Sequence, residues 1–250
     1  MGEQDVAGRT VLGRALALLG AFERAPDRRQ TLTELAATTG LPLTTVHRLC
    51  AELTRQGVLE RGADGRFGVG LKLWELGMLA PRAHGLREAA LPFLEDLYEV
   101  THENVQLVVL DGTEAVVVER LRARNAVRLV SRAGGRLPIH ATSGGLVLLA
   151  HAGEDAVRAV VAAGLPPYSP STITTEEAIR AALALARRQG WLELRDHLTV
   201  GSTSLAAPVI VKGRGAVAAV SVVGAAGDDP VRLLPALLTT ARGIARALAT

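Results

Sequence analysis

Polar side chains of the kinds that bind nucleic acid gather in the first third of the chain. They are Thr33, Thr44, Thr45, His47, Arg48, Arg61 and Arg66. The guanidinium of Arg48 can bond a guanine edge or hold a phosphate, and threonine hydroxyls suit phosphates or a thymine methyl group. His47 can do either, whereas Arg61 and Arg66 can neutralise phosphates or enter a minor groove. The alternative for each residue is structural: the threonines cap a helix and the arginines are merely solvated.

The elements predicted around these side chains form a helix-turn-helix with a β-hairpin wing. A 3.6-residue apolar period predicts helices over 10–22, 33–39 and 43–56, and Thr31 with Glu34 has the spacing of a capping box. Gly40 suits the left-handed position that closes the second helix. Short strands are expected over 58–61 and 66–69, because Asp64-Gly65 favours a tight turn between them. The third helix would enter a major groove N-terminus first, which brings its early polar residues to DNA.

Beyond residue 70 the pattern predicts an α+β domain rather than a doubly wound sheet. An apolar helix over 71–80 is followed by Pro81-Arg82-Ala83-His84-Gly85, which interrupts the helical pattern and marks a domain boundary. We then expect helices over 86–103, 143–152, 155–163, 176–189 and 235–249, and strands over 105–110, 115–120, 126–130, 204–211 and 216–223. Hairpins bracketed by helices are typical of an antiparallel sheet covered by helices. The predicted organisation is a winged helix-turn-helix domain at 1–70, a linker helix and hinge at 71–85, and a second domain at 86–250.

The residues offer little for catalytic, metal or cofactor chemistry. The six histidines are at least eleven residues apart and Cys50 is the single cysteine, so the sequence has neither a zinc spacing nor an internal disulfide. Cys50 lies on the apolar side of its helix, where we expect a packed core thiol. His140 near Ser143 lacks a GxSxG elbow, and Gly213-x-Gly215-x-x-Ala218 precedes a strand rather than a helix. We therefore expect no catalytic residues, no metal and no cofactor.

The composition predicts a soluble globular protein without membrane contact. The 250 residues carry a formal charge of +3 and 48% of them are hydrophobic. The most apolar stretch, 215–226, is much shorter than the ~20 residues of a membrane helix, and residues 1–9 do not resemble a signal peptide. We expect a cytoplasmic protein. Because the excess of positive charge is so small, DNA binding has to be argued from the local placement of residues.

Motifs in both halves of the chain resemble the IclR-type transcriptional regulators. The N-terminal motifs are Arg14-Ala15-Leu16, Leu32-Thr33-Glu34-Leu35-Ala36, Thr39-Gly40-Leu41-Pro42, Thr45-Val46-His47-Arg48-Leu49 and Gly57-Val58-Leu59-Glu60-Arg61. The C-terminal motifs are Pro138-Ile139-His140-Ala141-Thr142-Ser143-Gly144-Gly145, Thr172-Ile173-Thr174, Gly190-Trp191, Ala206-Ala207-Pro208-Val209 and Ala219-Val220-Ser221-Val222-Val223-Gly224. The resemblance follows nearly the whole chain in order. It implies a GAF-like effector-binding domain, a linker helix that helps to pair subunits, and dimers or tetramers on DNA.

The resemblance also implies a cup that binds a small effector. Its residues in this chain are Ser143, Gly144, Gly145, Leu146, Leu194, Ser204, Ser221 and Val223. Compared with the family pattern, leucine stands for a common lysine at 146 and for an acid at 194, serine stands for cysteine at 204, and valine stands for serine at 223. Small residues at 143–145 leave backbone amides that can hold a carboxylate, but the aliphatic replacements cannot satisfy a small polar acid such as glyoxylate or pyruvate. We expect an aromatic or branched-chain acid or a weakly polar hydrophobe; the alternative is a closed, filled core.

The sequence leaves two functions open. The first is a metabolite-responsive regulator, with repression favoured over activation. Its partners would be a double-stranded DNA operator with an inverted repeat, a small-molecule effector and further copies of the chain. The second is a small-molecule-processing enzyme of GAF-like build whose winged helix serves as a protein-interaction module. A saturable and strongly salt-dependent complex with DNA would favour the first.

Overall fold

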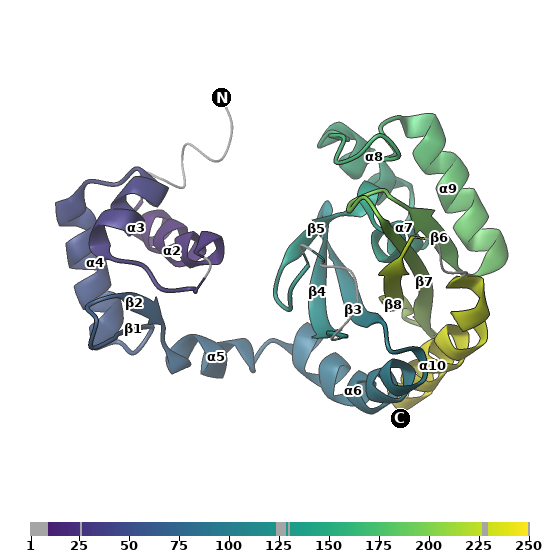
Figure 1. The fold of residues 1–250 in the computed structure, drawn as a ribbon, viewed down its shortest axis with the longest axis horizontal. Coiled ribbons are helices and arrows are strands. Elements are labelled where there is room, and N and C mark those ends of the chain that lie inside the picture. Colours follow the sequence, from purple (N-terminus) through teal and green to yellow (C-terminus); the bar gives the residue numbers. More distant parts are fainter. Residues whose placement is uncertain (1–9, 26, 124–128, 130, 227–229, 250) are drawn as a thin grey trace. The chain divides into compact units, whose positions relative to one another are not determined.

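The computed structural model describes residues 10–25, 27–123, 129, 131–226 and 230–249, without the side chains of 24, 81–84 and 230. The chain divides into two compact units, Met1–Pro81 and Arg82–Thr250, whose elements are labelled in Figure 1. Separate hydrophobic cores hold the helices and strands of each unit together. The strand predicted over 126–130 falls, apart from residue 129, outside the described residues.

The N-terminal unit begins with short helices whose ends follow from the sequence. They are α2 (Val11–Ala21), the 3-10 helix η1 (Phe22–Arg24), α3 (Leu32–Thr39) and α4 (Leu43–Arg55). Thr31 and Glu34 form the predicted capping box of α3, so two amides at the helix start are satisfied. Gly40 ends α3 with a φ of 70°, the left-handed conformation that glycine adopts without strain. The predicted helix-turn-helix is confirmed.

A β-hairpin and one further helix complete this unit. They are β1 (Leu59–Arg61), β2 (Phe67–Val69) and α5 (Leu71–Gly77). The two strands pair in antiparallel fashion with Arg61 opposite Phe67, which confirms the predicted wing. Cys50 is fully buried in the core of the unit, and burial raises the pKa of its thiol to about 11. This is the packed core thiol that the sequence predicts.

The C-terminal unit is built on a six-stranded antiparallel sheet in the order β5-β4-β3-β8-β7-β6. Its strands are β3 (Asn104–Asp111), β4 (Glu114–Leu121), β5 (Arg136–Pro138), β6 (Leu192–Arg195), β7 (Ser202–Val211) and β8 (Gly215–Ala225). The four long strands confirm the predicted hairpins. The short edge strands β5 and β6 were not predicted from the sequence.

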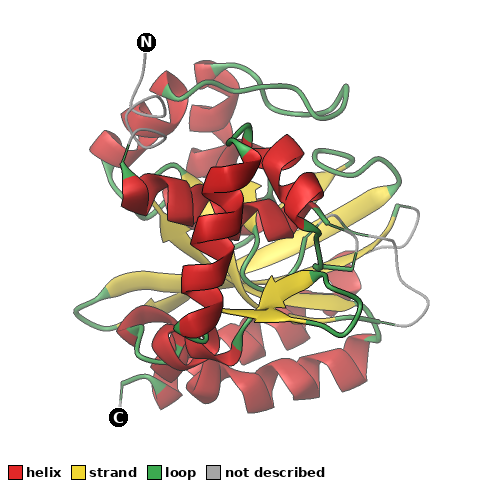
Figure 2. Ribbon diagram, turned by 90° about the vertical axis from the view of Figure 1, so that its left-hand side faces the viewer, coloured by secondary structure: helices red, strands yellow, loops and turns green. Residues whose placement is uncertain are grey.

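Helices lie on both faces of this sheet, and Figure 2 shows its strands between them. They are α6 (Pro81–Thr101), the 3-10 helix η2 (Ile139–Ala141), α7 (Ser143–Leu149), α8 (Glu154–Ala162), α9 (Glu176–Gln189), the 3-10 helix η3 (Pro230–Leu233) and α10 (Leu234–Ala247). One core joins α6 and α10 to one face of the sheet. A second core joins α7, α8 and α9 to the opposite face. The predicted α+β class is confirmed.

One prediction about the backbone is wrong. Residues 81–85 were expected to interrupt the helical pattern, whereas α6 begins at Pro81 and runs without a break to Thr101. Proline fits the first position of a helix, because its fixed φ is helical and its missing N–H has no partner there anyway. Pro81 therefore starts a helix rather than breaking one. Within the described part of the chain, no helix combines the length and the apolar character that a membrane crossing requires.

Candidate functional sites

The face of α4 that points away from the core carries most of the residues predicted to contact DNA. Thr44, His47 and Arg48 are exposed and Thr45 is half-buried, whereas Val46 is buried in the core. No acidic side chain lies in the first turn of α4. The partial positive charge of the helix N-terminus therefore stays available to a phosphate. The α4 surface thus combines hydroxyl, imidazole and guanidinium groups on one exposed face.

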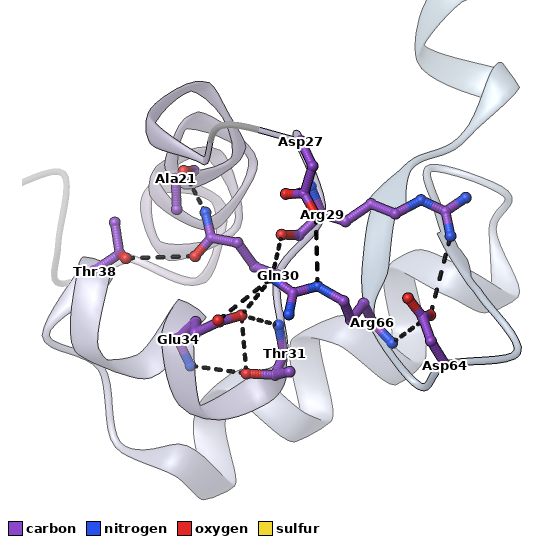
Figure 3. Close-up of polar contacts among 9 residues, drawn as sticks. All are labelled: Ala21, Asp27, Arg29, Gln30, Thr31, Glu34, Thr38, Asp64 and Arg66. Carbon is purple, nitrogen blue, oxygen red and sulfur yellow. Dashed lines mark hydrogen bonds and ion pairs between the residues drawn. The ribbon is translucent and has the colours of Figure 1, made fainter.

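Arg66 is used inside the winged helix rather than on its surface (Figure 3). Its Nη2 donates to the carbonyl oxygen of Arg29 at 2.9 Å and lies 3.1 Å from the carboxylate of Glu34. The backbone N–H of Thr31 and, more weakly, the nearby Arg66 charge hold the pKa of Glu34 below its ordinary value. The contact of Arg66 with DNA stays a prediction, and the structure gives its guanidinium a structural role. Its guanidinium contacts partners that are more than thirty residues away in sequence. The spacing of residues in the sequence does not reveal such contacts.

Gln30 is a second clamp between the wing and the helices, and the sequence analysis missed it. Its backbone pairs with Phe67 in both directions, with N···O distances of 2.9 and 2.7 Å. Its buried side chain donates to the carbonyl oxygen of Ala21 at 2.6 Å and accepts from the hydroxyl of Thr38 at 3.4 Å (Figure 3). Gln30 therefore fixes the wing to α2 and α3.

Arg61 and Thr33 keep their side chains exposed. The Arg61 guanidinium lies 5.4 Å from the ring centre of Phe67, and its Nε donates to the carbonyl oxygen of Gly65 at 3.4 Å. Among the described residues, Arg61 forms no ion pair with a carboxylate. A positive charge without an acidic partner at the edge of the wing is suited to a phosphate. Arg61 thus remains available for DNA in a way that Arg66 does not.

A cavity of about 50 Å³ lies in the C-terminal unit, on the face of the sheet that packs against α7. Seven of the eight residues predicted for the effector cup line it: Ser143, Gly144, Gly145, Leu194, Ser204, Ser221 and Val223. Strand register brings them together, because Leu194 pairs with Ser204 and Ser204 pairs with Val223. Cross-strand partners point to the same face of a sheet. The lining therefore alternates aliphatic side chains with hydroxyls.

Leu146 lies away from the cavity, whereas Gly144 and Gly145 are part of its lining. Leu146 is fully buried in the core and does not line the cavity, because successive residues of a helix point in different directions. The amide of Gly145 donates to the Thr142 hydroxyl that caps α7 at 3.3 Å, so this N–H is already used. A Cβ on Gly144 would lie 2.8 Å from Val108 Cγ2. The glycines let α7 pack closely against its neighbours, and carboxylate binding by the amides at the start of this helix stays a prediction.

Several polar residues of the lining were missed in the sequence. They are Gln106, Ser131, His197, Thr199 and Ser202. Gln106 was detectable, because it is a polar residue inside an otherwise apolar strand. Its Nε2 donates to the hydroxyl of Ser131 at 2.9 Å. The others lie in or next to loops, where polar residues give no signal of their own.

His197 is held at the cavity by its backbone, while the Nδ1 of its ring has no hydrogen-bond partner among the described residues. Its carbonyl oxygen accepts from the hydroxyls of Thr172 at 2.6 Å and Ser169 at 3.1 Å. Its Nδ1 is buried and has no hydrogen bond among the described residues. Burial lowers the pKa of this imidazole, with a smaller opposing effect of Asp196. A neutral ring with an unpaired nitrogen can bond a polar ligand group that enters the cavity.

His140 is structural. It is buried, its Nε2 donates to the carbonyl oxygen of Pro166 at 3.0 Å, and its ring centre lies 5.8 Å from that of Tyr168. It does not line the cavity beside α7 but borders a separate, open hollow of about 630 Å³. The described residues contain no cluster of three potential metal ligands. One unit therefore presents exposed polar and basic side chains on α4 and the wing, and the other unit contains a small cavity.

Comparison with known proteins decides the family. Residues 79–248 match the family described as the bacterial transcriptional regulator IclR C-terminal domain, and residues 11–63 match the IclR helix-turn-helix domain. The first match alone covers more than half of the chain. The chain belongs to the IclR family. It is therefore a DNA-binding transcriptional regulator, and the alternative of an enzyme with an auxiliary winged helix is set aside.

Relatives within the IclR family resemble the chain over most of its length. The regulator KipR of Bacillus subtilis is 30% identical over 212 residues, which are 84% of each chain. The transcriptional repressor IclR of Escherichia coli is 30% identical over 77% of this chain and 72% of its own. An IclR homolog from Microbacterium hydrocarbonoxydans, crystallised with 4-hydroxybenzoate, is 36% identical with a TM-score of 0.88 and covers 96% of this chain and 99% of its own. These similarities extend through both units.

Proposed function

We propose that this IclR-family chain represses transcription from an operator, and that a rather apolar carboxylate in the C-terminal cavity relieves the repression. The observation that carries the proposal is the lining, which places Leu194 and Val223 beside Ser204 and Ser221. Such a surface suits an acid with a hydrophobic body, because aliphatic groups cannot pair the polar atoms of a small keto acid. A relative crystallised with 4-hydroxybenzoate supports an acid of this kind. Relatives named as repressors support repression.

The proposed DNA contacts come from α4 and the wing. Thr44, Thr45, His47 and Arg48 would meet base edges and phosphates in a major groove. Thr33 and Arg61 would contact the flanking phosphates, while Arg66 would hold the wing in place. We keep residues 1–70 as the DNA-binding domain, 71–85 as the linker region and 86–250 as the effector domain.

The proposed assembly is a homo-oligomer, a dimer or a tetramer, that joins subunits through the helix at 71–77. Leu71, Trp74 and Leu76 on α5 are 69%, 62% and 50% exposed, and Leu79 just beyond it is 75% exposed. Large apolar side chains grouped in this way mark a surface that another protein covers. A two-fold assembly presents two equivalent copies of α4, so the proposed operator is an inverted repeat.

The size of the cavity sets a condition on the effector. About 50 Å³ is room for a few water molecules. A benzene ring therefore requires side chains such as Leu194, Val223 or Leu129 to move outward when it enters. A ligand shifts the protein toward such an expanded cavity if it binds that state more tightly than the closed one. An acid with an apolar body gains from contact with these side chains, at roughly 25 cal/mol for each Å² of apolar surface buried.

A thermal-shift panel tests the proposed effector class. Aromatic and branched-chain carboxylates, with 4-hydroxybenzoate among them, should raise the melting temperature more than glyoxylate or pyruvate, because a ligand bound only by the native state stabilises it. Leu194→Asp should weaken the binding of apolar acids by about tenfold or more, because the new carboxylate repels the carboxylate of the ligand. Ser221→Ala, which removes one hydroxyl from the lining and adds no charge, should weaken their binding less. Greater stabilisation by glyoxylate than by any apolar acid would contradict the proposal.

A further inference from the structure

The described lining of the cavity offers a carboxylate no side chain of opposite charge. None of its described lining residues is a lysine, an arginine, an aspartate or a glutamate. The amide of Gly145 is used by the Thr142 cap. A carboxylate moved out of water without a compensating partner is strongly destabilised. If the proposed effector is an acid, a positively charged group close to the wall would stabilise it more than uncharged donors alone.

Arg120 on β4 lies directly behind that wall. It pairs across the strands with Gln106, a lining residue, so both side chains point to the cavity face of the sheet. The Nη2 of Arg120 donates to Asn104 Oδ1 at 3.1 Å, and its Nη1 donates to the carbonyl oxygen of Ser131. The Ser131 hydroxyl accepts from Gln106. The guanidinium is therefore hydrogen-bonded to the backbone of one lining residue, Ser131, whose side chain bonds another, Gln106.

The positive charge of Arg120 has no counter-ion within the described part of the chain. Its neighbour Glu119 points to the opposite face of the strand, where its carboxylate lies 2.6 Å from Arg87 on α6. Burial lowers the pKa of Arg120 and repulsion from Arg122 lowers it further, with no carboxylate acting in the other direction. The Nε of Arg120 is buried without a hydrogen-bond partner. A half-buried cation in this state is stabilised by any anion that comes close.

We propose that Arg120 makes the cavity selective for an anionic ligand. It acts as a positioning residue: it orients Ser131 toward Gln106, whose polar atoms meet the carboxylate, and it supplies the positive charge that this carboxylate needs. The inference rests on the proposed function and deepens it, because it assigns the charge selectivity of the effector site to a residue outside the lining.

The test compares an acid with its neutral amide. Titration calorimetry with 4-hydroxybenzoate and 4-hydroxybenzamide should show that the unmodified protein prefers the acid by about tenfold or more. Arg120→Gln should remove this preference, whereas Arg120→Lys, which keeps the charge, should retain most of it. Arg188→Gln is the control, because Arg188 is an exposed arginine in the last turn of α9 and does not line the cavity. It should leave the acid-to-amide ratio unchanged within about twofold.

A second variant needs no ligand and does not depend on the folding of Arg120→Gln. Gln106→Glu places a carboxylate beside Arg120 and should raise the melting temperature of the free protein, because it supplies the missing counter-ion. A fall in melting temperature, or an acid preference that survives in Arg120→Gln, overturns the inference while the proposed function stands. If the unmodified protein binds neither compound, the proposed effector class is wrong and this inference falls with it.

Discussion

Arginines that look equivalent in the sequence of the N-terminal unit differ in what their guanidinium groups contact. Arg66 bonds the carbonyl oxygen of Arg29 and the carboxylate of Glu34. Arg48 and Arg61 have exposed side chains, and neither forms an ion pair with another described residue. The difference arises from tertiary partners, which composition and spacing do not encode. It separates residues that hold the wing together from residues that are available to DNA.

Arg48→Ala tests the proposed contact on α4. We expect specific operator binding to weaken by roughly 1–3 kcal/mol if Arg48 reads a base, and a uniform loss across all sequences if it only holds a phosphate. Arg55→Ala in the same helix is the control, because Arg55 lies in the last turn and pairs with Glu52. Fluorescence anisotropy with specific and scrambled duplexes measures the affinity for the operator and the affinity for non-specific DNA. Unchanged affinity in Arg48→Ala would remove this residue from the site.

Substitution of Arg66 and Arg61 should separate stability from DNA affinity. Arg66→Ala should lower the free energy of unfolding by about 1 kcal/mol, because charge-assisted bonds to Glu34 and the Arg29 carbonyl are lost from a side chain that is 31% exposed. Arg61→Ala should leave stability within about 0.5 kcal/mol and reduce the salt dependence of DNA binding by one phosphate contact. Urea unfolding and salt titrations measure the two effects. The reverse pattern would contradict the assignment of Arg66 to the wing.

Two histidines with lowered pKa values, His197 and His151, predict a loss of stability on mild acidification. Burial lowers the pKa of His197 and of His151, and Arg187 adds to the effect at His151. Below the ordinary histidine pKa of about 6.5 the unfolded chain therefore binds more protons than the folded one, so stability falls as pH falls. Melting temperatures should drop between about pH 7.5 and about pH 5.5, where carboxylates remain ionised. His197→Gln should flatten this slope, whereas substitution of the exposed His102 should not; equal slopes would refute the explanation.

At the scale of elements, local chemistry predicted helix ends and long strands well. The capping box of Thr31 with Glu34 and the left-handed Gly40 bound α3 as expected. The edge strands β5 and β6 have three and four residues, too few to show a two-residue alternation. Pro81 was read as a helix breaker, although it occupies the one helical position that suits proline. Seven of the residues predicted for the effector cup line one cavity. They were found through family motifs rather than from any periodicity, because strand register brings them together from distant segments.

The exposed apolar residues near α5 predict that this element joins subunits. Leu76→Glu with Leu79→Glu should weaken self-association by roughly 100-fold, because two buried leucines contribute about 1.5–3 kcal/mol each. Ile210→Glu is the matched control, since Ile210 is also 50% exposed but lies on β7. Light scattering across a concentration series measures the change. A protein that is monomeric at about 10 μM before any substitution would rule out this role for α5.

At the scale of the whole molecule, the exposed face of α4 and the cavity beside α7 belong to different units of one chain. Helix α6 of the C-terminal unit follows α5 closely in sequence, and Arg87 near its start pairs with Glu119 on β4. Glu119 precedes Arg120, whose bonds reach Ser131 at the cavity. Ligand binding can change DNA affinity only if the ligand binds the two states of the protein with different affinity. Such coupling typically amounts to a 5- to 150-fold change.

The most direct test of a ligand-responsive repressor is the affinity for DNA measured with and without the acid. Fluorescence anisotropy would use the full chain and the duplex upstream of its own coding region, with 4-hydroxybenzoate, its neutral amide and glyoxylate as additions. We expect a saturable, salt-dependent complex that 4-hydroxybenzoate weakens by about 5-fold or more, with smaller effects of the other two compounds. A specific complex whose affinity no acid alters, although the acid stabilises the protein, would contradict the account.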